Sequence, residues 1–139
     1  MTAAEKRKIL KSYAAAKAET DRLLEEIDRV KSSALARGIS YDGMPKGSGT
    51  NDLSAWAAKW DELERRLYDA YSREAEAIHR IEEGIEAVPD SRERTVLRAR
   101  YMSGMRIERI AEEMNLAVET TWKIHRKGIM HIWPNINVP

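Results

Sequence analysis

Apolar residues recur along the first part of the chain at alternating steps of four and three. Between residues 4 and 36 they are Ile9, Tyr13, Ala16, Thr20, Leu23, Ile27, Val30 and Ala34. This heptad spacing places them along one side of a helix, and no Gly or Pro interrupts the segment. The pattern predicts one long helix with a thin apolar seam, which needs a bulkier helix to pack against.

A second helical pattern runs from Asp52 to Val88 and supplies that partner. Its apolar positions are Leu53, Trp56, Trp60, Leu63, Leu67, Tyr71, Ala75, Ile78, Ile81, Ile85 and Val88. Asn51 or Asp52 is expected to cap its start, and Gly84 and then Pro89 to weaken and end it. We expect the two helices to pack as an antiparallel hairpin. Apolar surface left over on this arm predicts a homodimer.

The segment between these helices, residues 37–51, is predicted to be a loop. It holds four of the seven glycines and one proline in a short polar stretch. Its MPKGSG sequence lacks the phosphate-binding loop pattern and does not lie between a strand and a helix. We therefore expect no phosphate binding there.

Three shorter helices follow Pro89. Asp90 and Glu93 have the spacing of a capping box, which starts a helix over 91–102. Ser103-Gly104 ends it, a fourth helix lies near 107–114, and a fifth runs from 118 to about 132. The turn at 115–117 has the length found in a helix-turn-helix. We predict an all-α protein with a two-helix antiparallel arm over 1–88 and a three-helix domain over 89–139.

The charge is distributed unevenly along the chain. The total is +1, from 24 Lys and Arg against 23 Asp and Glu. From residue 90 onward, however, there are nine basic and six acidic residues, and residues 122–133 contain no acid. A basic C-terminal part on a near-neutral chain favours a nucleic-acid reader, although a solvated helix face has the same composition.

Composition argues against several kinds of chemistry. The absence of Cys excludes disulfides, thiolate catalysis and zinc fingers. Glu76 and His79 have the local spacing of a di-iron ligand pair, but a second pair is missing, and His125 and His131 are interpreted as surface histidines. No apolar run is long enough to cross a bilayer, and the N-terminus has no signal features. We expect no enzyme activity, metal, cofactor or membrane contact, and a soluble cytoplasmic protein.

The part of the sequence from Val88 to Ile132 resembles the promoter-reading C-terminal domain of bacterial sigma factors. The matching features are the Leu-Arg-x-Arg-Tyr run at 97–101, a Gly-containing break, the Ile-Ala-Glu-Glu-Met helix at 110–114 and a basic last helix. With the long arm and the MPKGSG loop, the layout also resembles small phage transcription activators of the RinA/ArpU type. The resemblance implies a dimer on double-stranded DNA, contact with RNA polymerase, late-gene activation and a bacterial host.

Two residues depart from this pattern. Ala117 stands where such domains usually have Ser or Thr to cap the recognition helix, a loss of about 1 kcal/mol of helix stability. Met105 likewise replaces a hydroxyl residue at the entry to the fourth helix. We expect both changes to affect stability rather than the DNA-facing side chains.

The fifth helix is the predicted recognition helix, with its N-terminal half in the major groove. Glu119 is expected to accept from cytosine, Lys123 or Arg126 to donate to guanine, and Val118 to touch a thymine methyl group. Trp122 has two interpretations, since it either packs on sugar or base or closes the domain core.

Phosphate contacts are predicted from other positions. Lys127 and His125 are assigned to phosphates, as are Arg106 and Arg109 at the start of the fourth helix. The candidate DNA-binding residues are therefore Val118, Glu119, Trp122, Lys123, His125, Arg126, Lys127, Arg106 and Arg109.

Two other functions remain open at this point. One is a sigma-like RNA polymerase adaptor that binds mainly protein, which salt dependence separates from a DNA binder. The other is a small terminase-like packaging subunit, which would assemble into a ring of many protomers. The residues themselves do not distinguish activation from repression.

Overall fold

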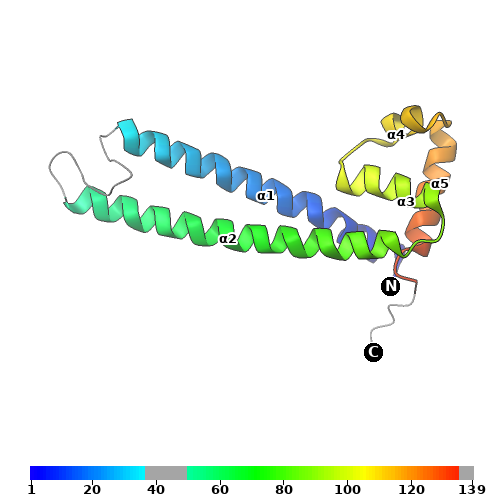
Figure 1. Ribbon diagram of the computed structural model, residues 1–139, viewed down its shortest axis with the longest axis horizontal. Coiled ribbons are helices and arrows are strands. Elements are labelled where there is room, and N and C mark those ends of the chain that lie inside the picture. The colour runs from blue at the N-terminus through cyan, green and yellow to red at the C-terminus, as the bar shows by residue number, and fades with distance from the viewer. Residues whose placement is uncertain (37–49, 135–139) are drawn as a thin grey trace. The chain divides into compact units, whose positions relative to one another are not determined.

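The computed structural model describes residues 1–36 and 50–134, without the side chains of residues 50–52. The elements are α1 (Ala3–Ala36), α2 (Thr50–Glu86), α3 (Ser91–Leu97), the π-helical segment η1 (Arg98–Met102), α4 (Ile107–Met114) and α5 (Val118–His131) (Figure 1). No strand occurs in these two ranges. The all-α prediction is confirmed.

The helix boundaries lie within two residues of the predicted ones. α2 begins at Thr50, so the predicted caps Asn51 and Asp52 lie inside its first turn. The MPKGSG loop lies outside the described residues. None of the helices within the described ranges combines the length and the hydropathy needed to cross a membrane.

The chain forms two compact units. Unit 1 comprises Met1–Ala16 and Glu74–Pro139, and unit 2 comprises Lys17–Arg73. Both long helices pass from one unit into the other, so the units divide within α1 and α2. The sequence predicts an arm over 1–88 and a domain over 89–139. Whether each of these parts folds on its own stays a prediction.

Unit 2 is a pair of packed helices. Leu23 of α1 forms a buried cluster with Leu63 and Ala70 of α2, and Lys59 forms an ion pair with Glu26 at 3.4 Å. The predicted partner positions are confirmed at Leu23 and Leu63. Tyr71 is 48% exposed instead, because the step from position 67 to the packed face is three residues here, to Ala70, rather than four.

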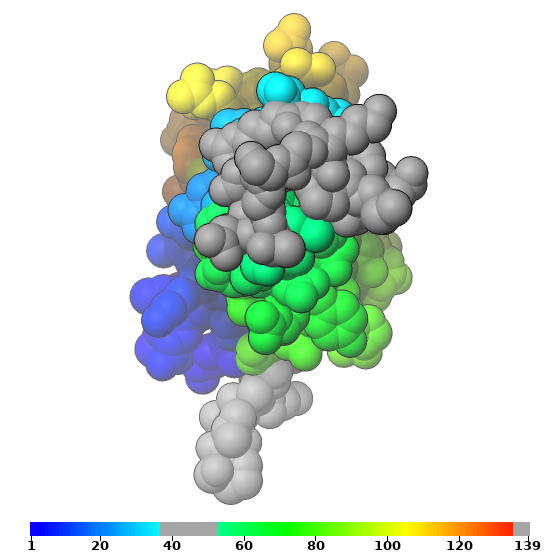
Figure 2. Space-filling model, turned by 90° about the vertical axis from the view of Figure 1, so that its left-hand side faces the viewer, coloured from blue at the N-terminus to red at the C-terminus, as the bar shows by residue number. Residues whose placement is uncertain are grey.

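The larger core of unit 1 joins the start of α1, the end of α2 and the C-terminal helices. It consists of Leu10, Ile81, Ile85, Val88, Leu97, Tyr101, Ile129 and Ile132. In the two overall views the start of α1, in dark blue, lies beside α2, in green (Figures 1 and 2). Leu10, one residue from the predicted Ile9, is the fully buried residue that α1 contributes to this core.

Gly84 is part of this packing and does not break α2. A Cβ at this position would lie 2.4 Å from Nε1 of Trp133. The missing side chain leaves room for the indole, which also has the Arg80 guanidinium 5.9 Å from its centroid. The glycine therefore allows the residues after α5 to return against α2.

A separate cluster supports the helix-turn-helix. Val96 of α3 is buried against Ile107 and Ile110 of α4, with Met105 and Trp122 packed around them. This small core holds α4 and α5 as one body on α3.

Candidate nucleic-acid interface

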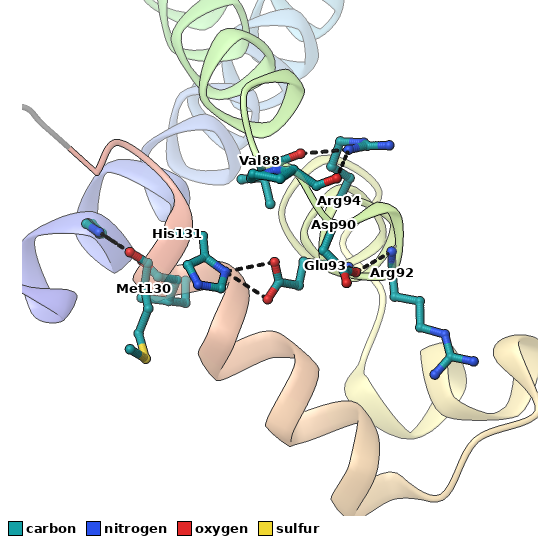
Figure 3. Close-up of polar contacts among 10 residues, drawn as sticks. Val88, Asp90, Arg92, Glu93, Arg94, Met130 and His131 are labelled. Atoms are coloured by element: carbon teal, nitrogen blue, oxygen red, sulfur yellow. Dashed lines mark hydrogen bonds and ion pairs between the residues drawn. The ribbon is translucent and has the colours of Figure 1, made fainter.

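The start of α3 is fixed by four hydrogen bonds. Oδ1 of Asp90 accepts from the backbone N–H groups of Arg92 at 2.8 Å and Glu93 at 3.0 Å. These bonds hold the pKa of Asp90 below its usual value, chiefly through the Glu93 N–H. Arg94 donates through Nη1 to the carbonyls of Val88 at 2.7 Å and Pro89 at 2.9 Å. Figure 3 shows these contacts at the link from α2 to α3.

Glu93 has a different role from the predicted one. Its carboxylate, in a side chain that is 5% exposed, lies 2.9 Å from Nδ1 of His131 at the end of α5. Only the Asp90 half of the expected capping box is present among the described contacts. Glu93 instead joins the first turn of α3 to the last turn of α5 (Figure 3).

The π-helical segment places Tyr101 in the core. The N–H of Ser103 donates to the carbonyl of Arg98 at 3.1 Å and that of Met105 to Ala99 at 2.9 Å. Gly104 then reverses the chain at φ +68, a conformation that glycine adopts without strain. The predicted break at Ser103-Gly104 is confirmed, and the extra residue of the π turn directs Tyr101 toward α5.

The turn between α4 and α5 is a helix C-cap of the Schellman type. Asn115 is left-handed, with φ 56, and the N–H of Leu116 donates to the carbonyl of Ala111 at 2.9 Å. The tight turn at 115–117 is confirmed. It sets the entry angle of α5.

α5 begins without a side-chain cap. Ala117 has the extended backbone of an N-cap residue but no oxygen to offer, and no side-chain hydrogen bond caps this end. At the entry to α4 the cap position falls on Arg106, one residue after Met105, and it too lacks a side-chain bond. Both helix starts therefore leave N–H groups free for an outside acceptor, such as a phosphate.

The predicted base-reading residues lie on the exposed side of α5. Glu119, Lys123 and Arg126 share one face of the helix and are exposed, and Val118 at its start is 42% exposed. Lys127 lies exposed beside them. None of the three basic residues forms an ion pair with a carboxylate of the described residues, so their charges remain available.

Trp122 closes the domain core. It is half-buried against the Val96, Ile107 and Ile110 cluster, and its ring meets that of His125 edge-on at 5.5 Å. On its other side the guanidinium of Arg100 lies 5.2 Å from the ring centroid. Of the two interpretations of Trp122, these contacts favour the core role.

His125 is buried, so the prediction that it lies on the surface is wrong. It is 3% exposed, and its Nε2 lies 2.7 Å from the hydroxyl of Tyr101. Burial, aided by the nearby charge of Arg100, lowers its pKa to about 4. This contradicts the predicted phosphate contact, because a buried neutral imidazole offers phosphate neither charge nor an accessible N–H. Its Nδ1 is buried without a hydrogen-bond partner in the described part of the chain.

Arg106 and Arg109 lie on the exposed side of α4 among acidic residues. They line a shallow surface hollow with Glu108, Glu112 and Glu113, and Arg109 pairs with Glu113 at 3.5 Å. Their positions at the start of α4 are as predicted. Their charges are, however, partly balanced, unlike those on α5.

Lys6 connects α1 to the end of α5, a contact that the sequence pattern did not predict. It is 7% exposed, and its Nζ donates to the carbonyls of Ile129 at 3.1 Å and Met130 at 3.0 Å. An ammonium group at the last carbonyls of α5 also complements the helix dipole. A basic residue within a charged segment gives no sign of such burial.

The fold and the free basic face define a DNA-binding helix-turn-helix domain in the C-terminal part of the chain. Residues 90–132 match the sequence model of the family described as Sigma-70, region 4. This part is therefore a sigma region 4 domain, of a kind found in sigma factors and other transcription regulators. No curated protein and no solved structure matches the chain.

Proposed function

We propose that the protein is a sequence-specific DNA-binding regulator of transcription, with α5 as its recognition helix. The observation that supports this most directly is the exposed face of α5, where Lys123, Arg126 and Lys127 have no acidic partner among the described residues. Glu119 on the same face supplies an acceptor for base edges. The family match over 90–132 supports the proposal that this face enters the major groove.

We further propose that it activates late genes of a phage or mobile element at promoters, together with RNA polymerase. The support is the resemblance of the whole layout to RinA/ArpU-type activators and the role of region 4 domains in transcription. The arm is proposed to form a homodimer. Among the described residues of unit 2, four large apolar side chains are exposed: Leu24 at 40%, Leu35 at 57%, Tyr68 at 73% and Tyr71 at 48%.

The decisive experiment is selection of bound duplexes from a random pool and from phage genomic DNA at two salt concentrations. The test variant is Lys123→Ala, Arg126→Ala, and the matched control is Arg65→Ala, Arg66→Ala on α2, which removes the same charge from unit 2. An enriched site that the test variant loses and the control keeps is the expected result. Absence of enrichment with the wild-type chain contradicts the proposal.

Single variants separate base reading from phosphate binding. Lys123→Ala is expected to relax base preference by about 1 to 3 kcal/mol at one position, whereas Lys127→Ala weakens binding to all sequences alike. Quantitative binding to the selected site and to its point variants measures both effects. Unchanged binding of both variants would show that this face of α5 is not the reading face.

A sigma-like polymerase adaptor is the second candidate, and the surface of α4 favours it. Glu108, Glu112 and Glu113 surround Arg106 and Arg109 there, and a surface of mixed charge suits a protein partner better than a phosphate backbone. In this case RNA polymerase is retained by the chain without DNA, and binding changes little with salt.

Sedimentation of the wild-type chain tests the proposed dimer, which a strict monomer at high micromolar concentration would contradict.

A further inference from the structure

The first turns of α1 carry a concentration of positive charge. Residues 5–11 read Glu-Lys-Arg-Lys-Ile-Leu-Lys, with four basic residues and one acidic residue. The acid is used locally, since Oε2 of Glu5 accepts from the backbone N–H of Thr2 at 2.6 Å, while the Glu5 N–H donates to the Thr2 hydroxyl. This reciprocal cap fixes the start of α1 and leaves the basic side chains in excess.

This basic segment is fastened to the recognition helix. Lys6 bonds the carbonyls of Ile129 and Met130 at the end of α5, and Leu10 is fully buried in the core that contains Ile129. Figure 3 shows the Met130 carbonyl engaged at this end of α5. The start of α1 therefore moves with α5 as part of unit 1.

Arg7 and Lys11 project from the same side of this docked segment. They are one helical turn apart, and both are exposed, next to the buried Lys6 and Leu10. Glu5 lies on the opposite flank of the helix. Neither Arg7 nor Lys11 forms an ion pair with any carboxylate in the described ranges.

The charge of Arg7 reaches the centre of the helix-turn-helix unit. Burial is the main cause of the lowered pKa of His125, and after it the charges of Arg100, Arg7 and Arg126 act in the same direction. Arg100 and Arg7 also oppose the rise that burial causes in the pKa of Tyr101. Basic side chains from α1, η1 and α5 thus act electrostatically on the buried His125, although they are far apart in sequence.

We propose that the start of α1 is a second DNA-contacting element, in which Arg7 and Lys11 bind backbone phosphates of duplex flanking the base pairs read by α5. This inference rests on the proposed function. It extends the interface beyond the matched residues 90–132 to the first turns of α1. The contacts carry no sequence information and act on affinity and on salt dependence.

The test compares Arg7→Gln, Lys11→Gln with a control, Arg29→Gln, Arg73→Gln, that makes the same charge change on exposed residues of unit 2. Binding to the selected site is measured over a range of salt concentrations, on a duplex trimmed to the enriched base pairs and on one with flanking sequence. Thermal unfolding by circular dichroism checks that both variants keep the wild-type stability.

The expected result is specific to the flanked duplex. On this duplex the slope of log affinity against log salt is less steep by about two for the test variant, since each phosphate contact contributes about 0.9 to it. The base preference of the test variant is unchanged. On the trimmed duplex it binds like the control. Equal slopes for test and control variants on the flanked duplex overturn the inference while the proposed function stands. No DNA binding by the wild-type chain overturns both.

Discussion

Lowering the pH from 7 to 5 is expected to destabilise unit 1 through His125. Its ring is 3% exposed and is hydrogen-bonded to the Tyr101 hydroxyl at 2.7 Å. Burial first, and then the positive charge of Arg100, lower its pKa from 6.5 to about 4. A proton on this ring would place a cation beside Arg100 in the core.

The sign follows from which state binds the proton. In the unfolded chain the imidazole has its ordinary pKa of 6.5, so between pH 6.5 and about 4 the unfolded state is protonated and the folded state is not. The free energy of unfolding therefore falls as the pH is lowered through this window. Between pH 7 and pH 5 the contribution of His125 amounts to about 2 kcal/mol.

Urea denaturation followed by circular dichroism at both pH values measures this effect. The variant His125→Gln keeps a polar group of similar length and does not titrate. The matched control is His79→Gln on α2, where the imidazole is 73% exposed and 3.2 Å from Glu83. His131 is present in all three proteins, so its contribution cancels in the differences.

The stability difference between wild type and His125→Gln is expected to change by about 2 kcal/mol between the two pH values. For His79→Gln the change stays below about 1 kcal/mol, as for an exposed ion pair. A difference for His125→Gln that is the same at pH 7 and pH 5 would refute the reasoning.

Three further substitutions test the packing of unit 1 and the start of α5, each by urea denaturation at pH 7. Lys6→Met keeps the apolar stem and removes the charged hydrogen bonds at the end of α5, so a loss of about 2 kcal/mol is expected, with little change in the exposed control Lys8→Met. Gly84→Ala is expected to destabilise by about 1 to 3 kcal/mol, because its Cβ displaces the indole of Trp133. That cost largely disappears in the Trp133→Ala background, and its persistence would contradict the clash. Ala117→Ser supplies the missing cap oxygen and is expected to stabilise by about 1 kcal/mol, whereas no gain would show that the cap position is already satisfied.

Elements with a strong periodic pattern were predictable from the sequence. Most of the seam of α1, most packed positions of α2 and the C-terminal helices follow from the spacing of apolar residues, and the break at Ser103-Gly104 follows from turn chemistry. The exceptions are Leu10 and Ala70, each buried one residue away from the predicted Ile9 and Tyr71. The exposed face of α5 follows from its buried one. Thr121, Gly128 and Ile129 are buried on one side of the helix, so Glu119, Lys123 and Arg126 lie on the other, exposed side.

The buried polar residues were not predictable in the same way. Lys6, Glu93 and His125 are 7%, 4% and 3% exposed, yet periodicity assigns polar residues to the surface by type. Each has a hydrogen-bond partner far along the chain, as when Lys6 bonds the carbonyl of Ile129 across 123 positions. A pattern confined to one helix contains no information about such a partner.

These buried polar contacts also determine how the interface is built. A region 4 domain taken alone, residues 90–132, contains α5 but lacks Lys6 and Leu10, which hold its C-terminal end. Without them the last carbonyls of α5 lose their charged hydrogen-bond donor, and the core around Ile129 loses the packing of Leu10. The recognition helix is thus supported by the first turns of the chain, and the same turns bring Arg7 and Lys11 into unit 1. Support of α5 and the proposed extension of the DNA contact therefore have one structural cause, the docking of the start of α1.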